Sequence, residues 1–305
     1  MKIGRPKVSK LCQSFIVEPE RSIKLKDRKT GWAQSGKLKK IGETKVREKA
    51  LEVLEADKQK LAEAQELLYA DRRFAMLIVL QGMDTAGKDG TIRHVMSGVN
   101  PQGCSVSGFK VPTATEHSHD FLWRYYNVLP ARGTIGIFNR SYYEDVLVVK
   151  VHPQNLELLP KKLDKVSEED FWEWRYNDIR NMEKHLARNG TVILKFFLHI
   201  SKKEQKKRLL SRLEDKEKYW KFSVNDLAER GFWDDYVKAY EEMLPATSTD
   251  YAPWFIVPAD DKWAARTIVA NAICSAIEGL GVKHPEVSAD EIKRLMEAKK
   301  KLESE

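Results

Sequence analysis

Residues 74–91 read FAMLIVLQGMDTAGKDGT, and this stretch decides the fold. Its apolar run at 74–80 has the length of a strand that is buried on both faces. The run leads into Gly82, four further residues and then Gly87-Lys88, which is the G-x-x-x-x-G-K spacing of a phosphate-binding loop. Glycines at these places let backbone N–H groups turn inward around an anion, and the following helix points its positive end at the same spot. Lys88 then supplies a point charge to terminal phosphates.

The loop departs from the usual pattern in its charges. Asp89 follows the lysine, where such loops usually carry a magnesium-binding Ser or Thr, and a second acid, Asp84, lies inside the loop. Two carboxylates beside a polyanion require a cation between them, so we expect a magnesium site with Asp84 as a ligand. The alternative is a Gly-rich turn that binds no ligand. The predicted phosphate contacts of the loop are Gly82, Ala86, Gly87, Lys88, Asp89 and Gly90.

Strand-like and helical segments alternate along the rest of the chain. Further strand candidates lie at 105–109, 134–139, 191–200 and 254–257, and helices are predicted at 44–70, 167–189, from 201 onward and at 261–279. This alternation predicts an α/β fold, with three α/β/α layers around a mostly parallel five-stranded sheet. Phosphate chemistry then belongs at the carboxyl ends of the strands. The chain divides into a basic arm (1–43), a main domain (44–282) and a charged helical tail (283–305).

The net charge is unevenly distributed. The 305 residues carry a formal charge of +8, but residues 1–50 alone hold 15 basic and 5 acidic side chains, so the remainder is slightly acidic. The arm could bind nucleic acid, an anionic polymer or an acidic neighbouring subunit, or it could wrap its own domain. With 42% hydrophobic residues, the body can form a sizeable core.

The cysteines and the apolar runs favour the cytoplasm. Cys12, Cys104 and Cys274 are far apart and form no C-x-x-C pair, which argues against a disulfide framework or a zinc site. The N-terminus lacks the apolar segment of a signal peptide, and no apolar run approaches the roughly 18 residues of a membrane helix. We therefore expect a cytoplasmic protein that does not enter a membrane.

A second polar motif ends the strand predicted at 134–139. Asn139 follows the apolar run, Arg140 comes next, and the first acid is Glu144. A strand beside a phosphate-binding loop normally ends in a metal-binding acid, so Glu144 is a second candidate ligand. The planar guanidinium of Arg140 suits a transferring phosphoryl group. A polar helix start without such a role is the alternative.

Further cationic candidates lie on helices and between strands. The segment 201–215 carries two i,i+4 pairs of cations, Lys203 with Lys207 and Arg208 with Arg212. Such pairs repel each other unless an anion lies between them, so the segment is either a lid over phosphates or a solvated helix. The other candidate phosphate contacts are Arg93, His94, Lys110 and Arg124.

Together these motifs resemble polyphosphate kinase family 2. The resemblance covers about residues 40–282. It rests on LQGMDTAGKDGTIRHVMSGVNPQG (80–103), IGIFNRSYYEDVLVVKVHP (135–153), HISKKEQKKRLLSRLED (199–215), ERGFWDDYVKAYEEML (229–244) and APWFIVPADDKWAAR (252–266). It implies a P-loop kinase-like fold with a helical lid at about 202–230, and transfer of a phosphoryl group between inorganic polyphosphate and a nucleotide. Carried onto this sequence, the implied catalytic residues are Asp84, Lys88, Arg140 and Arg208.

The resemblance also implies a subgroup, a cofactor and partners. Asp89, Asn139 and Glu144 are similar to the third class of the family, which phosphorylates both AMP and ADP. The cofactor is Mg²⁺, or Mn²⁺ in its place, with Asp84 and Glu144 as ligands. The partners are inorganic polyphosphate and adenine nucleotides, with guanine nucleotides as an alternative. We expect a homo-oligomer, a dimer or a tetramer, that does not bind nucleic acid.

We therefore expect polyphosphate to lie in a groove formed by Lys88, Arg93, Lys110, Arg140, Lys207 and Arg208. A nucleotide phosphate oxygen would attack the terminal phosphorus in line. Three alternatives remain: an ATP-dependent kinase of a nucleoside or small molecule, a phosphate-loop ATPase acting on nucleic acid, and a non-catalytic polyphosphate-binding protein.

Overall fold

The computed structural model describes residues 4–33, 36, 38–152 and 166–305. Five parallel strands form one sheet in the order β2-β3-β1-β4-β5. They are β1 (Ala75–Gln81), β2 (Cys104–Gly108), β3 (Ile135–Asn139), β4 (Thr191–His199) and β5 (Trp254–Pro258). Ile78 of the central strand lies opposite Ile137 on one side and Leu194 on the other. All five predicted strands are confirmed, and each boundary lies within one residue of its prediction.

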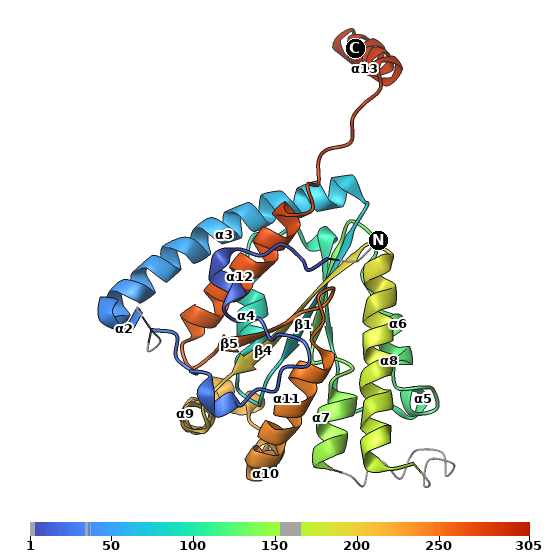
Figure 1. Cartoon of the computed structure of the whole chain (residues 1–305). Helices are drawn as coiled ribbons and strands as arrows, with labels where there is room; N and C mark the ends of the chain where they lie inside the picture. The colour runs from blue at the N-terminus through green and yellow to red at the C-terminus, as the bar shows by residue number, and fades with distance from the viewer. Residues whose placement is uncertain (1–3, 34–35, 37, 153–165) are drawn as a thin grey trace.

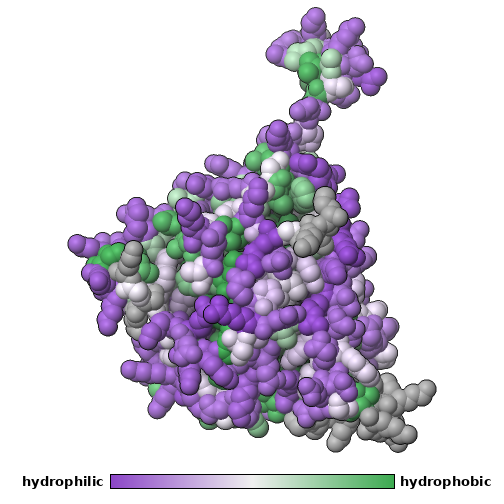
Figure 2. Space-filling model, in the orientation of Figure 1, coloured by the Kyte–Doolittle hydropathy of each residue, from purple (hydrophilic) through white to green (hydrophobic). Residues whose placement is uncertain are grey.

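Helices cover both faces of the sheet (Figure 1). One layer contains α3 (Glu43–Asp71), α4 (Lys88–Val95) and α12 (Lys262–Glu278), and the other contains α7 (Glu144–Val151), α8 (Glu168–Arg188) and α11 (Trp233–Thr247). A strand covered on both faces is expected to be mostly apolar, and every residue of β1 is buried. The predicted α/β/α arrangement is confirmed. The outer surface is mainly hydrophilic in the view of Figure 2.

The predicted lid lies between β4 and α11. It contains α9 (Lys202–Leu213), the 3-10 helix η5 (Lys216–Lys221) and α10 (Val224–Gly231). Ser201 begins α9, because its side chain accepts a hydrogen bond from the Glu204 N–H at 3.1 Å. The shorter helices are α1 (Lys10–Gln13), η1 (Leu25–Asp27), α2 (Leu38–Ile41), η2 (Pro101–Gly103), α5 (Ala114–His117) and α6 (Trp123–Tyr126).

The basic N-terminal segment packs against its own domain. The Val17 N–H donates to the Trp254 carbonyl oxygen at 2.9 Å, and the Phe15 carbonyl oxygen accepts from the Ile256 N–H at 2.8 Å, so the segment pairs with β5. Val17 and Leu25 are buried in the main hydrophobic core. Of the roles considered for the arm, wrapping its own domain is the one that the structure displays.

The C-terminal helix α13 (Ala289–Glu303) stands apart from the body (Figure 1), and none of its residues is buried. Among the described residues, no helix has the length and apolar character needed to cross a bilayer. The division of the chain at 43 and 282 stays a prediction, and residues 153–165 of the predicted main domain lie outside the described residues.

Candidate functional site

The loop between β1 and α4 has the geometry of an anion-binding site. Gly87 has a φ of +105°, and a Cβ at Gly82 would lie 2.9 Å from the Leu198 carbonyl oxygen, so both positions require glycine. Lys88 is buried, and its Nζ donates to the Gly82 carbonyl oxygen at 2.6 Å. Burial, and then the nearby Arg140, lowers the pKa of Lys88 to about 8. The loop therefore places a cation and the positive end of α4 at one point.

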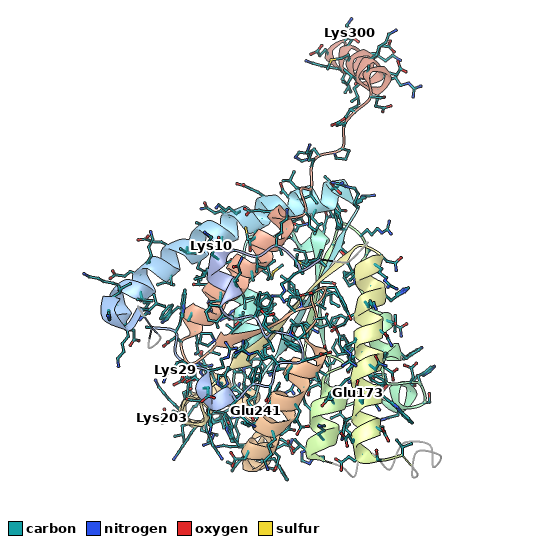
Figure 3. All side chains as sticks on the ribbon, in the orientation of Figure 1. Lys10, Lys29, Glu173, Lys203, Glu241 and Lys300 are labelled. Atoms are coloured by element: carbon teal, nitrogen blue, oxygen red, sulfur yellow. The ribbon has the colours of Figure 1, made fainter. Side chains whose placement is uncertain are left out.

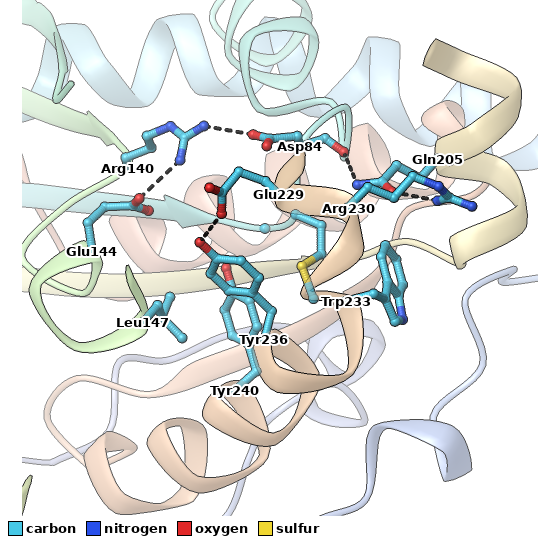
Figure 4. A pocket seen from close by; sticks show the side chains of 12 residues that line it. Asp84, Arg140, Glu144, Leu147, Gln205, Glu229, Arg230, Trp233, Tyr236 and Tyr240 are labelled. Carbon is cyan, nitrogen blue, oxygen red and sulfur yellow. Dashed lines mark hydrogen bonds and ion pairs between the residues drawn. The ribbon is translucent and has the colours of Figure 1, made fainter. Parts of the chain in front are cut away.

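Arg140 lies between two carboxylates beside this loop (Figure 4). Its guanidinium donates to Asp84 Oδ1 at 2.8 Å and to Glu144 Oε2 at 3.0 Å. The Glu144 charge is the main cause that raises the pKa of Arg140. Glu144 is the first residue of α7, and Arg140 lies in the turn before this helix with a φ of +66°. A non-glycine residue held in this left-handed conformation is strained, which is typical of functional sites.

A pocket opens beside Arg140, and the lid and α11 supply much of its lining (Figure 4). Gln205 Nε2 of α9 donates to the Asp84 carbonyl oxygen at 3.1 Å, and Arg230 Nη1 of α10 donates to Gln205 Oε1 at 2.7 Å. The Tyr236 hydroxyl donates to Glu229 Oε2 at 2.7 Å. These bonds connect the lid to the phosphate-binding loop and enclose a space between the loop and α11.

Sequence reasoning missed most of this lining. The residues that it did not assign are Met83, Leu147, Gln205, Glu229, Arg230, Trp233, Tyr236 and Tyr240. Trp233, Tyr236 and Tyr240 follow each other at helical spacing on α11, so they share a face. This spacing could have indicated a pocket-lining helix face, but it is equally expected for a face that packs in the core. Only the tertiary structure shows that this face of α11 lines the pocket.

The carboxylates beside Arg140 fit a magnesium ion that also binds substrate oxygens. Among the described residues, no group of three or more His, Cys, Asp or Glu side chains could hold a metal ion. Mg²⁺ needs less protein than that, because it usually keeps waters and binds one or two carboxylates together with substrate phosphates. Asp84 and Glu144 already flank one cationic group at 2.8 and 3.0 Å, so they would suit this ion.

Comparison with known proteins identifies the family. The sequence profile described as Polyphosphate kinase 2 (PPK2) matches residues 44–285. The chain belongs to the polyphosphate kinase 2 family. It is 52% identical over 251 residues to the ADP-polyphosphate phosphotransferase of Rhodopseudomonas palustris, an alignment that covers 82% of this chain and 87% of the relative. It is 47% identical over 237 residues to the AMP/ADP-polyphosphate phosphotransferase of Meiothermus ruber, covering 78% and 84%.

A solved structure supports the same family. The crystal structure of polyphosphate kinase 2 from Arthrobacter aurescens TC1 superposes with a TM-score of 0.82 at 38% sequence identity, covering 96% of this chain and 99% of that one. The predicted family is confirmed, and the protein is a phosphotransferase of the polyphosphate kinase 2 family.

This polyphosphate kinase 2 fold brings four predicted residues together: Asp84, Lys88, Arg140 and Glu144. Asp89 and Asn139 also meet, because Asn139 Nδ2 donates to Asp89 Oδ1 at 2.5 Å. An acid in place of Asn139 would put two carboxylates at this short distance. The neutral amide of Asn139 therefore avoids a repulsion between two carboxylates beside the loop.

Arg208 has a different position from the one expected. It is buried, and its five N–H donors are all used within the protein. They reach the Glu204 carboxylate and four carbonyl oxygens, those of Thr85, Ala86, Ala259 and Asp260, at 2.7–3.1 Å. This arrangement leaves no donor for a phosphate, so the expected direct contact is corrected to a positioning role. Arg208 ties the phosphate-binding loop to the turn between β5 and α12.

Arg124 is also buried in a structural cluster. Its guanidinium donates to the Lys110 carbonyl oxygen at 2.9 Å and to the Tyr125 hydroxyl at 2.6 Å, and it lies 3.8 Å from Asp145. The expected phosphate contact is corrected here too, because the guanidinium packs against its own protein.

The remaining predicted phosphate contacts are dispersed. His94 Nδ1 bonds the Gly90 carbonyl oxygen of its own helix at 2.7 Å, and Arg212 pairs with Asp226 at 3.2 Å. Lys207 is 80% exposed, and Lys110 is exposed as well. Arg93 is exposed on α4.

Proposed function

We propose that this protein transfers the terminal phosphoryl group of inorganic polyphosphate to ADP and to AMP in a reversible, magnesium-dependent reaction. The observation that carries the proposal is Arg140 held between Asp84 and Glu144 beside a phosphate-binding loop, in a chain of this family. The two relatives named above are an ADP and an AMP/ADP phosphotransferase, which supports these acceptors.

Positioning and charge neutralisation supply most of the catalysis in phosphoryl transfer. The loop N–H groups and Lys88 bind the end of polyphosphate, and Arg140 stabilises the charge of the transferring group. A bond forms between an acceptor phosphate oxygen and the terminal phosphorus, and the bond to the bridging oxygen of polyphosphate breaks. Bound Mg²⁺, held by Asp84 and Glu144, would neutralise charge on both polyanions. The acceptor oxygen is already ionised, so no general base is required.

The test is to incubate the purified protein with long-chain polyphosphate, Mg²⁺ and either AMP or ADP, and to separate the products by chromatography. We expect ADP and ATP from AMP, and ATP from ADP. Chelation of the metal should stop both reactions. A reaction confined to ADP would narrow the proposal to that acceptor, and no product from either would contradict it. Transfer from ATP to a nucleoside, without use of polyphosphate, would favour an ordinary kinase.

Two broader properties belong to the same proposal. Its nucleotide substrates and the absence of a cysteine framework support a cytoplasmic location. We also propose that the protein forms a dimer or a tetramer, which light scattering coupled to gel filtration measures directly.

A further inference from the structure

Three cations without an acidic partner lie together beside the phosphate-binding loop. Lys262 and Arg266 lie on the first turns of α12, and Arg93 lies on α4, which packs against α12. Within the part of the chain that the structure describes, these three side chains make no hydrogen bond and no ion pair. Glu204, which raises the pKa of Lys262, already pairs with Arg208. We call Arg93, Lys262 and Arg266 the cationic tract.

The tract is fixed next to the loop. Arg266 Nη2 lies 3.9 Å from the place where a Cβ on Gly90 would stand, so its guanidinium reaches the first turn of α4. Arg208 donates to the Asp260 carbonyl oxygen at 2.8 Å and to the Ala86 carbonyl oxygen at 3.1 Å. The start of α12 is therefore held at a set position relative to the loop.

Like charges kept together without counter-ions repel one another. After burial, Arg93 and Arg208 lower the pKa of Arg266, and Arg208 and Arg266 lower the pKa of Lys262. An anion between these side chains would reverse the sign of the interaction. The three uncompensated cations beside the phosphate-binding loop therefore form a favourable electrostatic site for a polyanion.

The two helices that carry the tract favour inorganic polyphosphate over nucleic acid. Proteins that bind single strands stack bases on exposed aromatic side chains. None of the exposed large hydrophobic side chains among the described residues belongs to α4 or α12, and the exposed aromatic pair Tyr219 and Trp220 lies on η5 of the lid. A chain of phosphates needs no such surface.

We propose that the cationic tract binds the inorganic polyphosphate chain beyond its reacting end. The inference rests on the proposed function and specifies the path of the donor. Polyphosphate leaves the loop along α4 and α12, on one side of the sheet (Figure 1). The pocket lined by Glu144, Glu229 and Tyr236, on the side of α7 and α11, is left for the acceptor nucleotide.

The test variant is Lys262→Gln/Arg266→Gln, and the matched control is Lys299→Gln/Lys300→Gln. The control removes the same charge from α13, which stands apart from the body (Figure 3, Lys300). We expect the test variant to raise the KM for long-chain polyphosphate roughly tenfold, because it loses charge-assisted phosphate contacts. The KM for tripolyphosphate, the KM for ADP and kcat should change less than about twofold. The control should resemble wild type.

A binding measurement separates this inference from the proposed function. Fluorescence anisotropy with labelled polyphosphate reports on the tract even if wild type transfers no phosphoryl group. In that case the proposed function fails, and weaker binding by the variant still supports the tract. A plot of log Kd against the logarithm of the salt concentration should also have a shallower slope for the variant than for wild type. If a thermal melt shows that the double variant folds poorly, the single variant Arg93→Gln, at an exposed residue of the same tract, is measured in its place.

Three results would overturn the proposal. One is an unchanged KM and Kd for long-chain polyphosphate. Another is an equal rise of the KM for long-chain polyphosphate and tripolyphosphate, which would place the tract at the reacting end. The last is weaker binding of single-stranded RNA with polyphosphate binding intact, which would make the tract a nucleic-acid site.

Discussion

Lys88 is the residue through which the loop acts most directly on the substrate. Its buried Nζ donates to the Gly82 carbonyl oxygen at 2.6 Å, so the ammonium group lies inside the loop before any phosphate binds. Lys88→Ala should lower kcat/KM by roughly a thousandfold, as the loss of a preorganised charge-stabilising group does elsewhere. Circular dichroism and the melting temperature should stay close to wild type. Near-normal turnover by the folded variant would refute the loop as the catalytic centre.

The same residue predicts a pH dependence. The pKa of Lys88 is lowered to about 8, and the charged form is the one that binds phosphate. The free enzyme should therefore lose activity as the pH rises through this value, and kcat/KM for polyphosphate should decline above about pH 8. A bound polyanion raises the pKa of Lys88, so kcat at saturating polyphosphate should decline only at higher pH. A kcat/KM that stays flat to about pH 9.5 would contradict this role.

Glu144 predicts the choice between the two acceptors. AMP brings one phosphate fewer than ADP, so its reacting oxygen needs a charge that recruits a cation toward the shorter acceptor. Glu144 lies 3.0 Å from Arg140 and lines the pocket, which suits this task. Glu144→Asn should reduce kcat/KM for AMP roughly tenfold more than kcat/KM for ADP. Glu229→Gln, at the same pocket, is the control. An unchanged ratio of the two values would show that Glu144 has no part in acceptor choice.

At the scale of elements, the strands were predictable and the contacts between elements were not. Four of the five strands are mainly apolar runs bounded by polar or turn residues, so the sequence pattern locates their ends, whereas β2 (CSVSG) is short and mostly polar. The left-handed conformation of Arg140 and the enclosed guanidinium of Arg208 depend on neighbours that are distant in sequence. A lysine in a helix gives the same sequence pattern whether its side chain contacts solvent or phosphate. The tract of α4 and α12 therefore emerges only when the helices are placed side by side.

Lys195 shows the same limit inside the sheet. It lies in the middle of β4, fully buried, and its Nζ donates to Glu183 Oε2 at 2.7 Å and to the Tyr143 hydroxyl at 2.9 Å. Glu183 Oε1 in turn accepts from the Tyr142 and Tyr143 hydroxyls at 2.8 Å. Tyr143 directly precedes Glu144, so this buried network fixes the turn that carries the site residues.

Removing one partner of this network should be costly. Lys195→Met leaves the Glu183 carboxylate buried without its cation, and we expect a loss of about 3–5 kcal/mol of unfolding free energy. Lys195→Met/Glu183→Gln should recover part of that loss, because no uncompensated charge remains. Urea denaturation of the wild type and both variants measures the differences. A cost below about 1 kcal/mol for Lys195→Met would mean that the pair contributes little to the fold.

At the scale of the whole molecule, the two ends of the chain differ in how they relate to the domain. The family profile matches residues 44–285 and leaves both ends outside. Yet the N-terminal segment pairs with the edge strand β5 and places Val17 and Leu25 in the core, whereas α13 has no buried residue. The N-terminal segment is therefore part of the folded domain in physical terms, although the profile does not include it.

Deleting residues 1–30 should destabilise the protein severely, and deleting residues 286–305 should not. The first deletion exposes the edge of β5 and the apolar surface under the arm, and each buried aliphatic side chain that is lost contributes about 1.5–3 kcal/mol. It also removes the bond from the Leu25 N–H to Glu241, which is 2.7 Å long. We expect the melting temperature to fall by more than about 10 °C, or the protein to aggregate, whereas the C-terminal deletion should shift it by less than about 2 °C. If both truncated proteins melt like wild type, the packing of the arm against β5 contributes nothing to the stability of the domain.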